Sequence, residues 1–269
     1  MRGASSADDV RARLDLAIAL ARRAGEVLRR GLGRATIEHK GEVELVTEFD
    51  RAAERLIVEG LGRAFPDDGV IAEEGARRDG HTWRWYVDPL DGTTNFAHGL
   101  PHFAVSIAAE RDGALEVGVV YDPMRDELFQ GLRGEGAYLG QRRLEVSTQA
   151  DLGRSLLVTG FPYDVRHNPD NNLDLFAHLA RRSRGVRRLG SAALDLAYVA
   201  AGRFDGYWEL RLAPWDLAAG VLLVREAGGT VTRLDREPAV LVPPFSVVAA
   251  NPKLYPALLA ALDEVRRPG

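Results

Sequence analysis

Apolar residues recur at helical spacing in two stretches near the start of the chain. In residues 8–31 they fall on one side of a helix, from Leu14 to Leu28. Residues 48–64 repeat this spacing, and the turn sequence Phe-Pro-Asp-Asp-Gly follows directly. The pattern therefore predicts two amphipathic helices, over 8–31 and 48–64.

Short apolar runs replace the helical spacing from residue 70 onward. Such runs, bounded by turn residues, are typical of strands. They predict strands at 70–72, 83–87, 103–110, 115–121 and 127–132. The Asp112-Gly113 pair predicts a hairpin turn between the third and fourth of these strands. Two helices followed by a run of strands indicate an α+β organisation for the first half of the chain.

Strands and helices alternate in the second half of the chain, which indicates an α/β organisation there. The predicted strands lie at 156–159, 186–189, 206–209, 230–234 and 246–250. The predicted helices lie at 173–181, 192–201, 217–227 and 255–265. The change of pattern predicts two domains, 1–147 and 148–269. Because no Pro-, Gly- or Ser-rich linker separates them, we expect them to pack tightly, with the functional site between them.

The composition narrows the classes of function. The chain has 269 residues, a formal net charge of −4 and no cysteine. A slightly acidic chain gives no electrostatic basis for bulk nucleic-acid or membrane binding. The absence of cysteine excludes disulfides, thiolate nucleophiles and Cys-ligated zinc. Neither an apolar signal segment nor a run long enough to cross a membrane is visible, so we expect a soluble, cytoplasmic protein.

One segment carries the clearest chemistry, the run from Trp85 to Phe96. Asp88 and Asp91 flank a proline, so the backbone between them is stiff and extended and can direct both carboxylates to one place. Two such charges repel each other unless a cation lies between them, and oxygen ligands favour Mg²⁺, Mn²⁺ or Ca²⁺. Gly92 and the start of a helix could seat a phosphate. The alternative is a structural Asp-Pro turn with a Thr cap before a helix.

Other acidic residues stand at the ends of predicted elements. Glu73 and Glu74 follow the strand at 70–72, which would bring Glu73 within reach of the Asp pair; alternatively, both are solvated surface carboxylates. Asp216 follows Pro214-Trp215 at a position where a helix N-cap belongs, and its alternative role is that of a cap.

Six motifs follow one another along the chain. They are Val46-Thr47-Glu48-Phe49-Asp50, Ile71-Ala72-Glu73-Glu74-Gly75, Asp88-Pro89-Leu90-Asp91-Gly92-Thr93-Thr94-Asn95-Phe96, Gly190-Ser191-Ala192-Ala193, Tyr207-Trp208-Glu209 and Pro214-Trp215-Asp216-Leu217-Ala218-Ala219-Gly220. In this order, across roughly residues 10–260, the chain resembles the inositol monophosphatase family of Mg²⁺-dependent, lithium-sensitive phosphatases. The resemblance implies a layered αβαβα sandwich like that of inositol monophosphatase and fructose-1,6-bisphosphatase.

The resemblance also implies a set of metal ligands for two or three Mg²⁺ ions. Glu73, Asp88 and the backbone carbonyl of Leu90 would hold the first ion. Asp88, Asp91 and Asp216 would hold the second, and Glu73 would help to hold a weaker third. Paired metals neutralise charge on the attacking and leaving oxygens in phosphoryl transfer, which agrees with a motif set rich in carboxylates.

Catalytic and substrate-binding roles follow from the same resemblance. Asp50 and Thr93 would polarise the attacking water, with Glu73 as a further catalytic residue. The amides of Gly92 and Thr93 would seat the phosphate. The leaving alcohol would be contacted by Gly190, Ser191, Ala192 and Glu209.

These features together indicate a phosphoric monoester hydrolase that uses Mg²⁺, with inositol 1-phosphate as the leading substrate and a homodimer as the expected assembly. Histidinol phosphate, fructose 1,6-bisphosphate and 3′-phosphoadenosine 5′-phosphate are alternative substrates. A different class of function is that of a regulatory protein, because some bacterial members of the family are thought to act on the transcription or translation machinery. Its binding surface would be the basic run at 181–188, which is otherwise a solvated helix end and turn.

Three histidines and one lysine stay ambiguous at this level. His39-Lys40 lies where the family often has a lysine shortly before the Val-Thr motif, so a lysine contact is left open. His98 and His102 flank Gly-Leu-Pro beside the main motif and are interpreted as residues that pack the loop.

Overall fold

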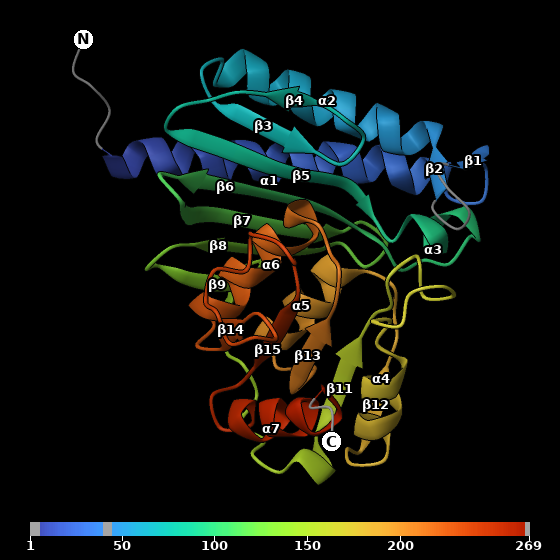
Figure 1. Cartoon of the computed structure of the whole chain (residues 1–269). Helices are drawn as coiled ribbons and strands as arrows, with labels where there is room; N and C mark the ends of the chain where they lie inside the picture. The colour runs from blue at the N-terminus through green and yellow to red at the C-terminus, as the bar shows by residue number, and fades with distance from the viewer. Residues whose placement is uncertain (1–5, 40–44, 267–269) are drawn as a thin grey trace.

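The computed structural model describes residues 6–39 and 45–266. These residues form five stacked layers in the order helix, sheet, helix, sheet, helix (Figure 1). The αβαβα sandwich implied by the family resemblance is therefore confirmed.

The outer helical layer consists of α1 (Ser6–Gly31) and α2 (Glu48–Ala64), which lie against one face of the larger sheet. Their apolar stripes, which include Leu14, Leu28 and Ile57, are buried against that face. Burial of such a stripe is the main source of stability for a surface helix, which explains why the helical spacing alone located both helices.

The larger sheet has eight strands and is mostly antiparallel. In spatial order its strands are β10 (Arg142–Arg143), β9 (Gly136–Leu139), β8 (Glu127–Leu132), β7 (Ala114–Asp122), β6 (Ala104–Arg111), β5 (Trp83–Asp91), β3 (Gly69–Ala72) and β4 (Arg77–Arg78). The one parallel pair is β3 with β5 among the neighbours in this sheet. That pair places the ends of two acidic strands side by side.

Helices α5 (Ala192–Ala200) and α6 (Pro214–Glu226) form the middle layer between the two sheets. They are apolar on nearly every side, and one core cluster runs from Val120 and Phe129 of the larger sheet through these helices to Tyr207 of the smaller sheet. The two predicted halves therefore share a core, as expected from the missing linker. The boundary at 147/148 itself stays a prediction.

The smaller sheet has five strands and lies between the middle helices and the last helical layer. In spatial order its strands are β12 (Gly185–Arg187), β11 (Leu156–Thr159), β13 (Gly206–Glu209), β15 (Val247–Ala250) and β14 (Thr230–Thr232). Its far face is covered by α4 (Leu173–Ala180) and α7 (Tyr255–Arg266). The remaining elements are β1 (Ile37–His39), β2 (Leu45–Thr47), α3 (Thr93–Ala97) and the short 3₁₀ helix η1 (Leu152–Arg154).

Two predictions at element ends were wrong. The strand predicted to end before Asp88 continues to Asp91, because an irregularity in its pairing with β6 accommodates the proline. Asp216 is not the N-cap of α6: the cap position is Ala213, and the helix begins at Pro214. Proline is well suited to the first helical position because it has no N–H to lose there and its φ is already helical.

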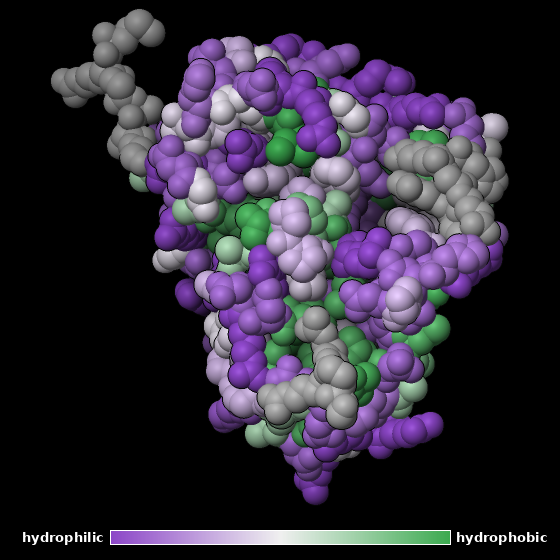
Figure 2. All heavy atoms as spheres, in the orientation of Figure 1, coloured by the Kyte–Doolittle hydropathy of each residue, from purple (hydrophilic) through white to green (hydrophobic). Residues whose placement is uncertain are grey.

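Hydrophilic residues cover most of the face shown in Figure 2, and hydrophobic residues show mainly in its recesses. No helix in the described part of the chain is long and apolar enough to cross a membrane.

Candidate active site

A bulge in β5 directs both aspartates of the Asp-Pro-Leu-Asp segment to the same side of the sheet. Asp88 pairs with Ser106 and Asp91 with Ala104, so β5 gains one residue relative to β6 between these pairs. In a regular strand two residues three positions apart point to opposite faces, and one extra residue brings them to the same face. Pro89 is tolerated there because a bulge releases it from the ladder.

Glu73 reaches the aspartate pair through the parallel pairing of β3 with β5. Ala72 is in register with Val87, and the Glu73 amide donates to the Val87 carbonyl at 3.1 Å. The next residue on each strand is therefore a carboxylate, Glu73 on one and Asp88 on the other. The structure thus brings together the two acidic strand ends that the sequence placed about fifteen residues apart.

Asp91 joins β5 to the start of α5 in the middle layer. Its two carboxylate oxygens accept hydrogen bonds from the Ser191 hydroxyl at 2.5 Å, the Ala193 amide at 2.7 Å and the Ala192 amide at 3.3 Å. A carboxylate at a helix N-terminus is favoured by the unpaired amides and by the helix dipole. One aspartate therefore lies both in the acidic cluster and at the contact between the two halves of the chain.

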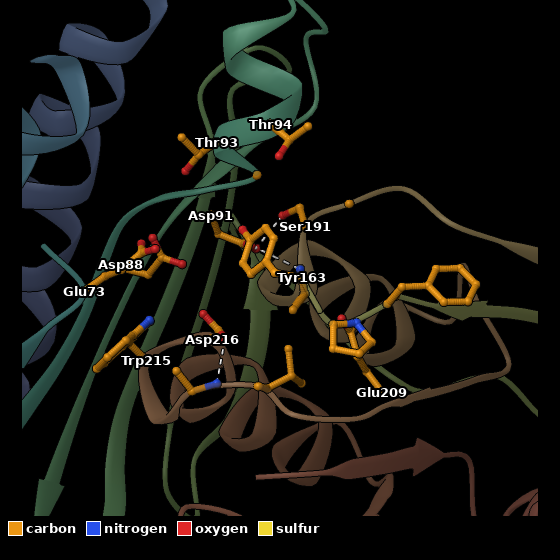
Figure 3. A pocket seen from close by; sticks show the side chains of 18 of the residues that line it. Glu73, Asp88, Asp91, Thr93, Thr94, Tyr163, Ser191, Glu209, Trp215 and Asp216 are labelled. Atoms are coloured by element: carbon orange, nitrogen blue, oxygen red, sulfur yellow. Dashed lines mark hydrogen bonds between the residues drawn. The ribbon is translucent and has the colours of Figure 1, made fainter. Parts of the chain in front are cut away.

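Asp216 enters the cluster from the first turn of α6. One of its carboxylate oxygens accepts a hydrogen bond from the Ala213 amide at 2.7 Å, which fixes the side chain against its own helix start. Together Glu73, Asp88, Asp91 and Asp216 line one cavity of about 280 Å³, shown from close by in Figure 3.

The cluster gathers several carboxylates in a place that is largely shielded from water. Burial, and then the negative charges of Glu73, Asp91 and Asp216, raise the pKa of Asp88 well above its ordinary value. Burial also raises the pKa of Asp91 to about 6, although hydrogen bonds from Ser191 and from the amides at the start of α5 oppose the change. For Asp216, burial and the charges of Asp91 and Glu73 act in the same direction. A cation among these carboxylates would remove the repulsion that raises these pKa values.

The donor set fits a hard divalent cation. Among the residues of ranges 6–39 and 45–266, no three His, Cys, Asp or Glu side chains are grouped as a ready-made metal site. The four carboxylates nevertheless share one cavity, and the Leu90 carbonyl lies at its edge, 2.9 Å from the Thr93 hydroxyl. Oxygen ligands of this kind suit Mg²⁺ or Mn²⁺ rather than zinc.

Asp50 is placed by a capping box at the start of α2. The Thr47 amide donates to one oxygen of its carboxylate at 2.9 Å, and the Thr47 hydroxyl also contacts that oxygen. The Thr93 hydroxyl lies 3.1 Å from the other oxygen. Burial raises the pKa of Asp50, and the hydrogen bonds from Thr47 and Thr93 oppose that change. The predicted Asp50–Thr93 pair is therefore formed, beside the acidic cluster.

Gly92 occupies a position that other residues could adopt only with strain. Its φ is +97°, and a Cβ there would lie 3.1 Å from the His102 carbonyl and 3.2 Å from the Gly190 carbonyl. Gly92, not a threonine, caps α3, which corrects the structural alternative considered for this turn. The Asn95 side chain donates to the carbonyls of His102 and Leu189, each at 2.8 Å, and so ties this turn to the loop of residues 190–192.

Glu209 ends β13 on the opposite side of the cavity from the acidic cluster (Figure 3). The Tyr207 hydroxyl donates to its carboxylate at 2.6 Å. A side chain at Gly160, the residue after β11, would collide with the Glu209 carboxylate. Glu209 can therefore lie where it does only because this residue is a glycine. Burial raises the pKa of Glu209 to about 7, and the hydrogen bond from Tyr207 partly offsets this.

Among the further residues that line the cavity, three have polar side chains to which the sequence gave no role in the site. Tyr163 comes from the loop after β11, Arg188 follows β12, and Arg211 follows β13. Arg188 belongs to the basic run at 181–188, which the sequence did single out. Nothing in the sequence distinguished Arg188 from the other arginines of that run as a cavity residue. Tyr163 and Arg211 carried no signal, because their loops are placed by contacts with distant residues.

The ambiguous residues lie away from the cavity or outside the described ranges. The His102 side chain is half-buried and its ring centre lies 6.2 Å from that of Tyr198, in agreement with a packing role, whereas His98 is exposed. Neither histidine lines the cavity. Lys40 lies outside the described residues, and of His39 only the backbone, in β1, is described.

Comparisons with known proteins agree on one family. A model described as the inositol monophosphatase family matches residues 9–267. The chain is 46% identical over 259 residues to a Nus factor SuhB of Pseudomonas aeruginosa, covering 93% of this chain and 95% of that protein. It is 49% identical over 215 residues to an inositol-1-monophosphatase of Rhizobium meliloti, covering 78% and 81%. A solved inositol monophosphatase from Anabaena matches with a TM-score of 0.87 and 44% identity, covering 96% of this chain and 97% of that one.

Proposed function

The chain belongs to the inositol monophosphatase family, and from that premise we propose that it hydrolyses a small phosphate monoester with Mg²⁺, inositol 1-phosphate being the leading substrate. The observation that carries the proposal is one cavity in which four carboxylates and Thr93, itself hydrogen-bonded to Asp50, lie on one side and Glu209 lies on the other.

The metal ligands in this proposal are Glu73, Asp88, the Leu90 carbonyl, Asp91 and Asp216. When bound there, Mg²⁺ would neutralise charge on the attacking and leaving oxygens and lower the pKa of water. The mutual repulsion of these buried carboxylates supports the assignment, since a cation would relieve it.

The attacking water is oriented by groups of the chain itself. The Thr93 hydroxyl lies within reach of both the Leu90 carbonyl and Asp50. In this proposal the Leu90 carbonyl faces the metal, so the hydroxyl donates its hydrogen bond to Asp50 and its oxygen accepts one from the water. Glu73, as the other catalytic residue, accepts the second hydrogen bond of that water. The water oxygen attacks phosphorus as the ester P–O bond breaks. The attacking water gives up one proton on the side of Glu73 and the leaving oxygen takes up one proton, so that the products are the alcohol and hydrogen phosphate.

The phosphate and the alcohol contact different parts of the cavity. The amides of Gly92 and Thr93, at the start of α3, face the phosphate. The loop of Gly190, Ser191 and Ala192 adjoins the alcohol, and Glu209 accepts hydrogen bonds from its hydroxyl groups. An ionised carboxylate only accepts hydrogen bonds, so it suits a leaving group that offers several hydroxyl donors. This favours a polyol phosphate as the substrate.

A phosphate-release screen tests the substrate assignment. The panel contains inositol 1-phosphate, histidinol phosphate, fructose 1,6-bisphosphate and 3′-phosphoadenosine 5′-phosphate, each with Mg²⁺. We expect inositol 1-phosphate to give the highest kcat/KM. A higher kcat/KM for one of the other three would replace the substrate and keep the reaction class.

The name of the Pseudomonas relative favours a second candidate function, that of a regulatory protein which binds transcription machinery. The basic run that could serve it has five exposed arginines, Arg181, Arg182, Arg184, Arg187 and Arg188. Arg182 is paired with Glu264, and Arg188 lines the cavity, so the side chains on offer to a partner are chiefly the other three.

A pull-down from bacterial lysate at physiological salt tests this second candidate. The test variant reverses the charge of Arg181, Arg184 and Arg187 to Glu. The control variant reverses three exposed arginines elsewhere, Arg23, Arg55 and Arg63. The regulatory role is supported if the wild type captures RNA polymerase or its factors, the test variant does not, and the control variant does.

The family resemblance also leads us to propose a homodimer, which light scattering on the purified protein would test.

A further inference from the structure

Tyr163 occupies an unusual position for a large aromatic side chain. It is 53% exposed, yet it lines the same cavity as the acidic cluster. Its ring stands in the middle of the cavity in Figure 3, between Asp91 and Ser191 on one side and Glu209 on the other. An exposed aromatic ring leaves apolar area in water, and a ligand that covers it recovers that free energy.

The loop that carries Tyr163 is held at both of its ends. At its base the buried Asn172 side chain donates to the Thr159 hydroxyl at 2.9 Å and to the Gly160 carbonyl at 2.5 Å, and accepts from the Trp208 indole at 2.6 Å. Next to Tyr163, Asp164 forms an ion pair of 2.8 Å with Arg211, which lines the cavity. The ring is therefore presented by an anchored loop.

The hydroxyl of Tyr163 stays protonated beside the cluster. The part of the side chain that the cavity walls shield from water, and then the negative charges of Glu73, Asp216, Asp91 and Asp88, raise its pKa above the ordinary value. The side chain therefore adds no negative charge to the cavity. What it offers a substrate is an uncharged ring face with one hydroxyl donor at its edge.

The two walls of the cavity are chemically complementary to a ring-shaped polyol. Glu209 can accept hydrogen bonds from hydroxyl groups at the rim of such a ring. The C–H faces of the same ring are apolar and need a flat apolar partner, which makes many weak dispersion contacts. Pro162 and Trp215 add further apolar area to the lining of the same cavity. An open-chain alcohol has no flat face to place against it.

We propose that Tyr163 is a specificity-determining residue whose ring covers the C–H face of a cyclic polyol leaving group, so that cyclic polyol phosphates are preferred to acyclic ones. This inference rests on the phosphatase function proposed above and adds to it a wall of the substrate site. Because the contact exists equally in the bound substrate and in the transition state, it acts on KM and leaves kcat little changed.

The test compares steady-state kinetics on inositol 1-phosphate, a cyclic substrate, and glycerol 2-phosphate, an acyclic one. The variants are Tyr163→Ala, which removes the ring, and Tyr163→Phe, which keeps it. Leu173→Ala is the matched control, since Leu173 is also a large exposed apolar residue near this loop but does not line the cavity.

We expect Tyr163→Ala to raise KM for inositol 1-phosphate about tenfold, the size of a typical aromatic contact, and to change KM for glycerol 2-phosphate much less. Tyr163→Phe should keep most of the preference, and Leu173→Ala should leave the ratio of the two kcat/KM values as in the wild type. Equal losses on both substrates, or a Tyr163→Phe variant as poor as Tyr163→Ala, would overturn the proposal.

The wild-type enzyme separates this inference from the proposed function. Hydrolysis of glycerol 2-phosphate without hydrolysis of inositol 1-phosphate would keep the phosphatase and overturn the role of Tyr163. Hydrolysis of neither substrate with Mg²⁺ would refute the phosphatase function, and the inference with it.

Discussion

Asp91 illustrates how one side chain serves both the acidic cluster and the fold. All three of its hydrogen-bond partners are donors, the Ser191 hydroxyl and the amides of Ala192 and Ala193. In Asp91→Asn an NH₂ group would face at least one of these donors. The substitution therefore removes a charge from the proposed metal site and also a buried acceptor from the start of α5.

We predict that Asp91→Asn lowers kcat by at least about 10²-fold, because metal-supplied charge stabilisation would be the main source of catalysis. It should also lower the free energy of unfolding by about 1–3 kcal/mol, since a buried donor loses its acceptor. Phosphate release and urea unfolding measure the two effects. A purified Asp91→Asn protein with near-normal turnover would contradict the metal assignment.

Glu209 should determine substrate choice rather than the chemical step. It faces the cavity from β13, away from the Asp50–Thr93 pair. Glu209→Ala should therefore lower kcat/KM for inositol 1-phosphate by an amount equivalent to about 1–3 kcal/mol, and that for p-nitrophenyl phosphate, which has no leaving-group hydroxyls of this kind, much less. Equal losses on the two substrates would mean that Glu209 is structural or linked to the metals.

The raised pKa of Glu209 also predicts a pH-dependent stability. Burial raises this pKa to about 7, so the folded protein binds the proton more tightly than the unfolded chain does. Its contribution therefore favours folding at pH values below the ordinary carboxyl pKa and is lost as the pH rises towards 7.

In Glu209→Gln this titration is absent, so the variant should gain stability relative to the wild type between pH 5 and pH 8, by up to about 3 kcal/mol. Urea unfolding at both pH values, in the presence of EDTA, measures the gain. Glu59→Gln on the exposed face of α2 is the control. A difference between variant and wild type that is the same at both pH values would show that Glu209 titrates normally.

At the scale of elements, the apolar pattern predicted most of the helices and strands because each buries a regular stripe or face. It could not reveal the bulge in β5, since a bulge adds one residue without changing which residues are apolar. It also missed β1, β2, β4, β9 and β10, which are two to four residues long and too short to show an apolar pattern. Pro214 did signal the start of α6, but Asp216 was the more familiar type of cap.

The residues of the candidate site also fall into those that the sequence could predict and those that it could not. Glu73 and Asp88 could be predicted to meet, because adjacent strand ends define their positions. Tyr163 and Arg211 could not, because their loops depend on an ion pair and on the Asn172 hydrogen bonds, which join residues far apart in sequence. Sequence motifs revealed the proposed metal ligands and Glu209, whereas Tyr163 and Arg211 could be found only in the structure.

One buried ion pair joins α1 to the turn before β3, in addition to the apolar stripe. Arg13 donates to both oxygens of Asp68, at 2.9 and 3.0 Å, and its guanidinium lies 4.0 Å from the ring centres of Phe65 and Trp83. The Trp85 indole donates to the same carboxylate at 2.8 Å. Removing one partner of such a pair leaves the other charge buried without compensation.

We therefore predict that Arg13→Ala lowers the free energy of unfolding by about 3–5 kcal/mol. Arg63→Ala, which breaks an exposed pair with Glu59 on α2, should lower it by less than about 1 kcal/mol. Thermal or urea unfolding of the two variants gives the comparison. Similar small losses in both would show that the Arg13–Asp68 pair is not an anchor of the helix.

At the scale of the whole molecule, the proposed site exists only where the two halves of the chain meet. Glu73, Asp88 and Asp91 come from the larger sheet, whereas Glu209 and Asp216 come from the smaller sheet and the middle helices. The Asp91 hydrogen bonds to the start of α5 join these parts directly. Such a site suits a small ligand bound between the layers. The acidic cluster lies at one end of the site, and Glu209, the proposed contact for hydroxyl groups, lies at the other.

The central claim is that the buried carboxylates hold Mg²⁺ and that phosphate-ester hydrolysis depends on it. The most direct measurement is the rate of phosphate release from inositol 1-phosphate by the purified protein as Mg²⁺ is added back after treatment with EDTA. The account predicts no release above background without the metal and a rate that rises and saturates as Mg²⁺ increases. A protein that releases no phosphate at any Mg²⁺ concentration, or releases it equally fast in EDTA, would contradict it.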